Sequence, residues 1–193
     1  MAGVRQFDEG EMLGKALEVF WRKGMRATTM LDLAEATGVQ RGSLYNAYGG
    51  KDDIFLLAFD AYVERFLASL SKALEAADPQ DGLTALFDCA IASMTRGTPA
   101  RGCLSTRTAT EAAQDDPRIQ PKLRGMLDEL HRIVVAALST QAAQARLAVT
   151  PEQAADLVVT FTRGLAVMER VYQDPAHLKR IAAALVQALF RAP

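Results

Sequence analysis

Residues 28–48 read TTMLDLAEATGVQRGSLYNAY and predict two short helices joined by a tight turn. Thr29 is placed as an N-cap, and Asp32 follows it at the spacing of a capping box. Gly38 supplies the residue that turns with a positive φ where the first helix must end. Two helices joined in this way can set a recognition helix into the major groove of DNA.

The second helix of the pair divides into a buried edge and an outward face. Leu44 and Tyr48 lie four residues apart and predict the edge that packs inward. The outward side chains are of types that hydrogen-bond to base edges and phosphates, namely Gln40, Arg41, Ser43, Tyr45 and Asn46. This face therefore predicts a surface that reads DNA.

From about residue 8 to residue 59 the chain resembles the DNA-binding domain of the TetR/AcrR family of bacterial transcriptional regulators. The resemblance covers the Thr-Thr start, the Ala-x-x-x-Gly-Val turn that begins at Ala34, the Gly-x-Leu-Tyr element that begins at Gly42, and Lys51 just beyond. It implies a homodimeric repressor that releases a palindromic, double-stranded operator when a small molecule binds the second domain. The DNA-binding residues that we infer are Thr28, Thr29, Gln40, Arg41, Gly42, Ser43, Tyr45, Asn46 and Lys51.

Several of these residues have more than one interpretation. Arg41 is interpreted as a base contact because arginine is the commonest reader of guanine, although most arginines are simply solvated. Tyr45 and Lys51 are interpreted as phosphate contacts. The alternatives are a core aromatic residue for the first and an exposed residue at a helix start for the second. Thr28 and Thr29 begin a helix whose free N–H groups can also hold a phosphate.

Charge favours a few placed contacts over a broad basic field. Residues 1–60 contain seven Lys/Arg and nine Asp/Glu, so a general basic patch is absent. Between Phe20 and Lys51, however, five basic residues stand against two acidic ones. A helical interaction or dimerisation protein without operator binding therefore stays open as an alternative.

The composition indicates a globular cytoplasmic protein. Half of the 193 residues are hydrophobic and 23% are charged. Acids near the N-terminus replace the apolar run of a signal peptide, and no apolar stretch is long enough to predict a membrane span. Cys89, Cys103, His131 and His177 show no metal-ligand spacing. We therefore expect no metal, no cofactor and no enzyme activity.

Hydrophobic periodicity predicts an all-α chain of about nine helices. The first three form a helix-turn-helix domain, residues 1–50, and residues 51–193 form a larger effector-binding and dimerisation domain. Beyond the motif, the expected helices span about 8–23, 51–77, 83–94, 103–113, 117–145, 151–172 and 175–191. The domains share the long helix at about 51–77, so an effector that shifts this helix would change the separation of two recognition helices.

Helix positions suggest where the effector would bind. The candidate pocket residues are Phe66, Phe87, Met94, Cys103, Thr106, Thr110 and Met126. The Gly102-Cys103-Leu104 element resembles one found in a subset of the family, in some members of which a cysteine in this region senses oxidants or electrophiles. Arg101 and Arg107 flank Cys103 and would lower its pKa, whereas the alternative is an inert buried thiol. A regulator switched by modification of Cys103 is thus a further alternative.

The last two predicted helices carry an apolar band that is wider than one core contact needs. Two such helices can form a four-helix bundle with those of a second copy, and the resemblance also implies a dimer interface here. The candidate interface residues are Leu157, Phe161, Gly164, Leu165, Met168, Tyr172, Leu185 and Leu189. An internal core is the alternative for this band.

Overall fold

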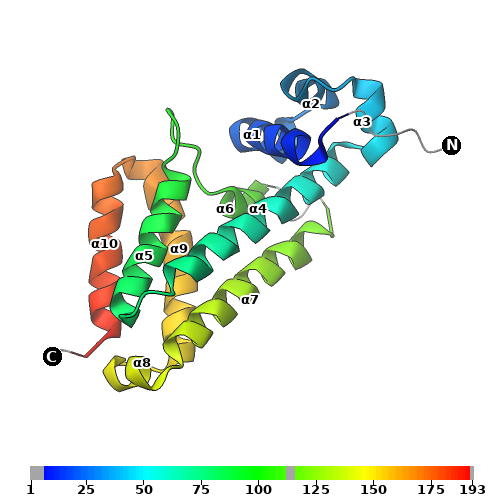
Figure 1. The fold of residues 1–193 in the computed structure, drawn as a ribbon. Helices are drawn as coiled ribbons and strands as arrows, with labels where there is room; N and C mark the ends of the chain where they lie inside the picture. The colour runs from blue at the N-terminus through cyan, green and yellow to red at the C-terminus, as the bar shows by residue number, and fades with distance from the viewer. Residues whose placement is uncertain (1–6, 112–115, 192–193) are drawn as a thin grey trace. The chain divides into compact units, whose positions relative to one another are not determined.

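The computed structural model describes residues 7–111 and 116–191 and shows ten helices in them. Their bounds are α1 Glu9–Ala27, α2 Met30–Thr37, α3 Arg41–Tyr48, α4 Lys51–Ala73, α5 Pro79–Met94, α6 Leu104–Glu111, α7 Ile119–Leu138, α8 Gln141–Arg146, α9 Pro151–Tyr172 and α10 Pro175–Leu189 (Figure 1). The described residues contain no β-strand, only an isolated bridge between Leu147 and Phe190. The all-α prediction is confirmed.

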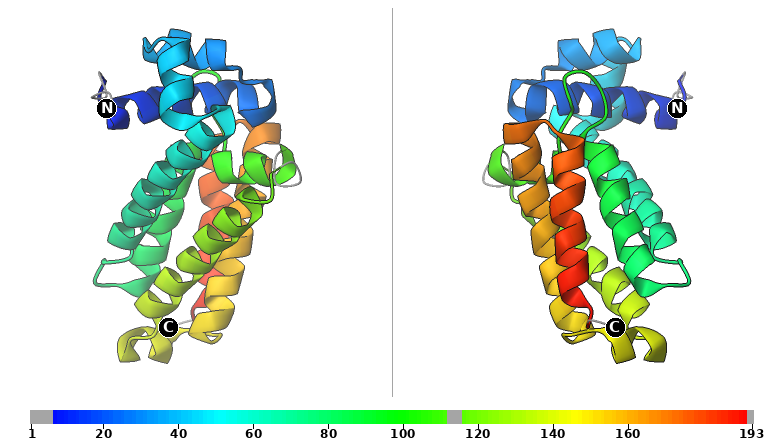
Figure 2. Two further views of the ribbon diagram at one scale, coloured as in Figure 1. Left: turned by 90° about the vertical axis from the view of Figure 1, so that its right-hand side faces the viewer. Right: turned by 90° about the vertical axis from the view of Figure 1, so that its left-hand side faces the viewer.

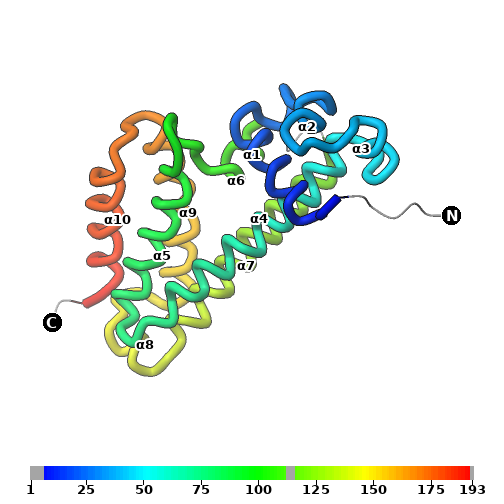
Figure 3. The backbone as a smooth tube through the Cα atoms, turned by 45° about the horizontal axis from the view of Figure 1, so that its top comes forward, coloured from blue at the N-terminus to red at the C-terminus, as the bar shows by residue number. Residues whose placement is uncertain are grey.

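The predicted count of about nine helices was one too low. The single helix expected at about 117–145 is broken between α7 and α8, where the Thr140 side chain accepts a hydrogen bond from the Ala143 N–H and starts a new helix. Figure 3 follows the backbone through this short connection into α9. The bounds of other helices differ by a few residues: α1 ends at Ala27, α4 ends at Ala73, and α5 begins at Pro79, four residues before the expected start, because the Asp78 side chain caps it.

The chain divides into two compact units, and the break along α4 lies between Arg65 and Phe66. The first unit holds α1, α2, α3 and the first part of α4, together with residues 107–122. Aromatic side chains join α1 to α4 within it. The Phe20 and Phe55 rings meet edge to face with centroids 5.0 Å apart, and the Trp21 and Tyr62 rings do so at 5.1 Å. These contacts supply a core on which the α2–α3 pair is held.

The second unit holds residues 66–106 and 123–193. Within it α5, α9 and α10 lie side by side (Figure 2). Leu83 and Leu86 are fully buried, and the Phe87 and Phe161 rings join α5 to α9 edge to face at 5.9 Å. Across the described ranges, no helix is both long enough and apolar enough to cross a membrane.

Candidate nucleic-acid interface

The start of α2 is built as the sequence predicts. The Asp32 N–H donates to Thr29 Oγ1 at 3.2 Å, and the Thr29 N–H donates to Asp32 Oδ2 at 2.9 Å, which completes the capping box. Lys23 Nζ also contacts Asp32 Oδ1 at 2.6 Å. At the other end of α2, Gly38 has φ of 73° and its N–H donates to Ala34 O. The turn into α3 is therefore fixed at both ends of α2.

The two faces of α3 are also as predicted. Leu44 and Tyr48 are buried, and the Tyr48 hydroxyl donates to Glu9 Oε1 on α1 at 3.2 Å. The outward side chains are all exposed: Gln40, Arg41, Ser43, Tyr45 and Asn46. Within the part of the chain that the structure describes, none of these five makes a hydrogen bond or ion pair through its side chain. Their polar groups are consequently available to an external partner.

Gly42 lies on the same outward face. It is exposed, and a Cβ built at this position meets no atom within 4 Å. Glycine lowers helix stability relative to alanine, and no internal contact requires it here.

Lys51 has hydrogen-bond partners within the chain. Its ammonium group donates to the carbonyl oxygens of Met25, Arg26 and Thr28, each at 3.0 Å. An ammonium has three N–H donors, so all of them are directed at the end of α1. The ammonium group is thus directed at α1 rather than outward, and the phosphate contact of Lys51 stays a prediction.

Thr28 is also removed from the predicted DNA surface. It is 1% exposed, and its hydroxyl donates to Gly24 O at 2.6 Å. Gly24 has φ of 79° and interrupts the helical geometry of α1, close to where the sequence predicts the end of that helix. The buried threonine thus fixes the last turn of α1, whereas Thr29 stays exposed at the start of α2.

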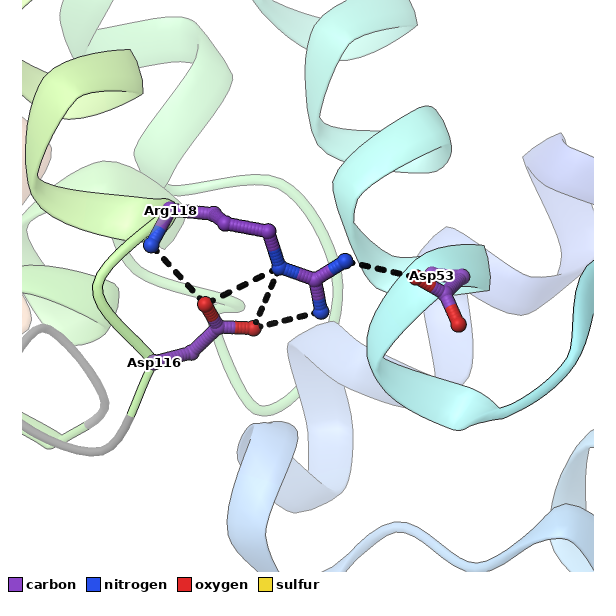
Figure 4. Close-up of polar contacts among 3 residues, drawn as sticks. All are labelled: Asp53, Asp116 and Arg118. Carbon is purple, nitrogen blue, oxygen red and sulfur yellow. Dashed lines mark hydrogen bonds and ion pairs between the residues drawn. The ribbon is translucent and has the colours of Figure 1, made fainter.

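Distant residues support α1 and α4 within the first unit, and sequence reasoning missed them. Arg107 on α6 donates to Trp21 O at 2.8 Å and contacts Glu111 Oε1 at 2.8 Å. At the start of α4, Asp53 pairs with Arg118 at 2.7 Å, and Arg118 also pairs with Asp116 (Figure 4). These hydrogen bonds hold the pKa of Asp116 below its usual range. Arg107 and Trp21 are 86 residues apart, and Arg118 and Asp53 are 65 apart, so no local pattern could indicate these two pairs.

The candidate effector residues are largely interior. Phe66, Phe87, Met94, Cys103 and Met126 are buried, Thr106 is half-buried, and Thr110 is exposed. Two hollows in the second unit, one beside Thr150 and one beside Pro99, are lined by other residues. The proposed pocket therefore stays a prediction.

Cys103 has a cationic neighbour, but not one of those expected. Burial by itself would raise the pKa of the thiol, yet the Arg163 charge and hydrogen bonds from Ser105 and Thr106 outweigh it and hold the pKa below its usual value. Arg163 Nη1 lies 3.8 Å from Cys103 Sγ and donates to Ser105 Oγ at 2.7 Å. Arg101 instead donates to the Ser93 carbonyl.

Exposed apolar side chains gather on α9. Of the eight large hydrophobic side chains that are exposed among the described residues, five lie on this helix: Leu157, Val167, Met168, Val171 and Tyr172. Two predicted interface residues are excluded, because Leu165 is 1% exposed and Leu189 is 2% exposed within the chain itself. Phe161 and Leu185 are half-buried, and Gly164 is exposed.

The α2–α3 pair with its glycine turn defines the first unit as a helix-turn-helix domain. The family described as "Bacterial regulatory proteins, tetR family" matches residues 13–58, and "Tetracyclin repressor-like, C-terminal domain" matches residues 79–185. The chain belongs to the TetR family.

Relatives are similar over part of their length. The chain is 31% identical over 120 residues to the HTH-type transcriptional regulator YezE of Bacillus subtilis, and the aligned residues cover 62% of each chain. It is 34% identical over 122 residues to the HTH-type transcriptional repressor ComR of Escherichia coli, and the aligned residues cover 61% of this chain and 57% of ComR. The match thus spans about three fifths of the length of these two curated relatives.

Solved structures show the same fold over nearly the whole chain. The TetR family transcriptional regulator CifR, complexed with double-strand operator DNA, superposes with a TM-score of 0.83 at 23% identity, over 96% of this chain and 99% of that one. A TetR transcriptional regulator from Chloroflexus aurantiacus superposes with a TM-score of 0.81 at 21% identity, over 96% of both chains.

Proposed function

We propose that the protein is a homodimeric transcriptional repressor of the cytoplasm, which binds a palindromic operator and releases it when a small molecule binds the second domain. The observation that carries this proposal is the outward face of α3, where five exposed polar or aromatic side chains have no partner within the described chain. The repressor name of ComR and the operator complex of CifR support the same function.

The proposed roles follow from side-chain chemistry. Arg41, at the first turn of α3, reads a base edge, because its two-pronged guanidinium matches the acceptors of guanine. Tyr45 is 48% exposed and donates its hydroxyl to a phosphate. Gly42 lets the backbone approach the DNA closely. Lys23 is already paired with Asp32, so few cations remain and the salt dependence of binding should be shallow.

The test is titration of operator and scrambled DNA at three salt concentrations. Arg41→Ala should lose about 1–3 kcal/mol per half-site on the operator and relax the choice at one base pair. Gly42→Ala should leave the thermal stability equal or higher, because alanine favours a helix, yet weaken binding by steric contact. Arg132→Ala, which removes an exposed arginine paired with Glu129 on α7, is the matched control.

Two outcomes would contradict the proposal. If the wild-type chain showed the same weak affinity for all DNA, the helical interaction or dimerisation protein without operator binding would be the better interpretation. If Gly42→Ala and Arg41→Ala both bound the operator like Arg132→Ala, the outward face of α3 would not be the DNA-binding surface.

The pairing of Cys103 with Arg163 favours a second mode of release, in which a thiol-modifying reagent replaces the reversible effector. The same titration of operator DNA tests this thiol mode of release. N-ethylmaleimide should release wild-type protein and the Cys89→Ser variant from the operator, but not Cys103→Ser. Burial raises the pKa of the Cys89 thiol, so this residue is the unreactive reference. Equal release of Cys103→Ser would exclude the thiol mode and leave a reversible effector.

A further inference from the structure

A small cavity of about 210 Å³ lies in the second unit, where the end of α5 meets the end of α9. Figure 1 shows these two helix ends beside the loop that follows α5 and the turn into α10. The cavity is lined by Thr95, Gly97, Thr98, Pro99, Ala100, Glu169, Gln173 and Pro175. It is smaller than the roughly 300–1,000 Å³ of sites for drug-sized ligands, so it suits a small molecule or one end of a larger one.

Glu169 is the only charged residue among the eight that line this cavity. Its side chain lies on the inward face of α9 and is 2% exposed. The Oε2 atom is sealed from solvent and receives no hydrogen bond from the residues that the structure describes. A buried carboxylate oxygen without a donor is costly, so a ligand in the cavity that brings a positive charge and N–H donors gains free energy when the Glu169 carboxylate turns to meet it.

The backbone around Glu169 also favours a cation. Thr95 caps the C-terminus of α5, and Gln173 caps the C-terminus of α9, so two helix ends with partial negative charge face the same cavity. The N-terminus of α10 also lies beside the cavity. Its free N–H groups at Ala176 and His177 already donate hydrogen bonds to the Asp174 carboxylate. In the loop that follows α5, the Arg101 N–H donates to Arg96 O and the Gly102 N–H donates to Met94 O. The carbonyl oxygens of residues 97–100, between these two hydrogen bonds, accept none from the described backbone and can bind a ligand.

Three arginines nearby do not neutralise the site. The guanidinium of Arg170 lies against Gly102, where a Cβ would come within 3.1 Å of it. Arg101 donates to Ser93 O at 3.0 Å, and Arg96 is exposed. None of the three lines the cavity. Burial raises the pKa of Glu169, and the Arg170 charge opposes this only in part.

We propose that this cavity binds a small organic cation, with an ammonium or guanidinium group held by the Glu169 carboxylate and the carbonyls of residues 97–100. The binding of the cation is independent of DNA. Its role as the charged end of the effector rests on the proposed function.

The test is calorimetric titration of the full chain without DNA, with methylguanidinium and ethylammonium as probes and N-methylurea as their neutral counterpart. The chloride concentration is held constant throughout. Wild-type protein should bind at least one of the two cations saturably and should not bind N-methylurea. Glu169→Gln keeps the shape of the side chain and removes its charge, so its affinity for the cation should fall at least about tenfold. Glu152→Gln, an exposed glutamate in the first turn of α9, should bind like the wild type.

Three results would overturn the proposal: no saturable binding of either cation to wild-type protein, equal binding by Glu169→Gln, or an equal loss in Glu152→Gln. A circular-dichroism melt of each variant verifies that the binding measurement is made on folded protein. Because no DNA is present, a failure of operator binding would leave these results unchanged, and the two proposals are tested separately.

Discussion

Asp32 fixes the start of α2 with one carboxylate that serves two partners. It accepts hydrogen bonds from Lys23 Nζ and from the Thr29 N–H, and together these lower its pKa from 3.8 to about 2. A carboxyl group whose folded-state pKa is depressed stabilises the fold above its unfolded pKa. The contribution is then lost as the pH falls from about 4 to about 2.

Asp32→Asn is therefore expected to lower the melting temperature at pH 7 by a few degrees. The difference from wild type should shrink as the pH falls from about 4 through about 2, because the Asp32 carboxylate is progressively protonated over this range. Thermal melts over this pH range check the prediction. Asp128→Asn, an exposed aspartate on α7, should give a profile like that of wild type. A difference between Asp32→Asn and wild type that did not change with pH would show that the carboxylate charge is not what stabilises α2.

At the scale of elements, Lys51 connects the end of α1 to the start of α4. Its three hydrogen bonds satisfy carbonyls that have no partner within α1, since the last turn of any helix leaves such groups unpaired. Lys51→Met keeps the length of the side chain and removes all three donors. It should lower the free energy of unfolding by about 1–3 kcal/mol.

The same variant distinguishes support from DNA contact. If Lys51 only joins α1 to α4, folded Lys51→Met should have the same slope of log DNA affinity against log salt concentration as wild type. A phosphate contact would instead reduce the slope by about one. Denaturant melts and salt titrations check the two effects. Lys15→Met on α1, where an exposed lysine pairs with Glu11, is the matched control and should change neither by much.

Helix starts and helix faces could be predicted from the sequence because their causes lie within a few residues. Thr29 and Gly38 act on neighbouring N–H or carbonyl groups, and the structure confirms both. Other contacts join residues that are far apart in the chain. Lys51 meets carbonyls 23–26 residues before it, and Arg163 meets Cys103 across 60 residues. Such partners depend on helix packing, which periodicity does not specify.

At the scale of the whole molecule, the exposed face of α9 is the feature that a single copy leaves unexplained. Leu157, Met168, Val171 and Tyr172 are each at least 40% exposed, and Gly164 lies among them with nothing within 4 Å of a Cβ placed there. Apolar side chains gathered on one helix face are typical of a protein interface, and a C2 dimer would bury the same face of both copies. This face, without Leu165 and Leu189, is the dimer surface that we propose.

Met168→Glu and Val171→Glu should each weaken the dimer at least about tenfold, because each places an unpaired charge in an apolar interface. The folded monomer should keep its melting temperature within a few degrees, since both positions are exposed in it. Leu165→Glu should instead unfold the second unit, because that side chain is buried within the chain. Sedimentation over a range of concentrations, together with thermal melts, separates the two effects.

Operator binding should fall together with the dimer, because two recognition helices must hold both half-sites at once. Affinity for a full palindrome should then approach affinity for a single half-site in Met168→Glu, while the half-site affinity itself stays unchanged. Ala136→Glu, an exposed alanine on α7, is the control for an added charge and should remain dimeric. If Met168→Glu and Val171→Glu both sedimented as the wild-type dimer, the face of α9 would be excluded. The copies would then have to meet through another surface of the chain.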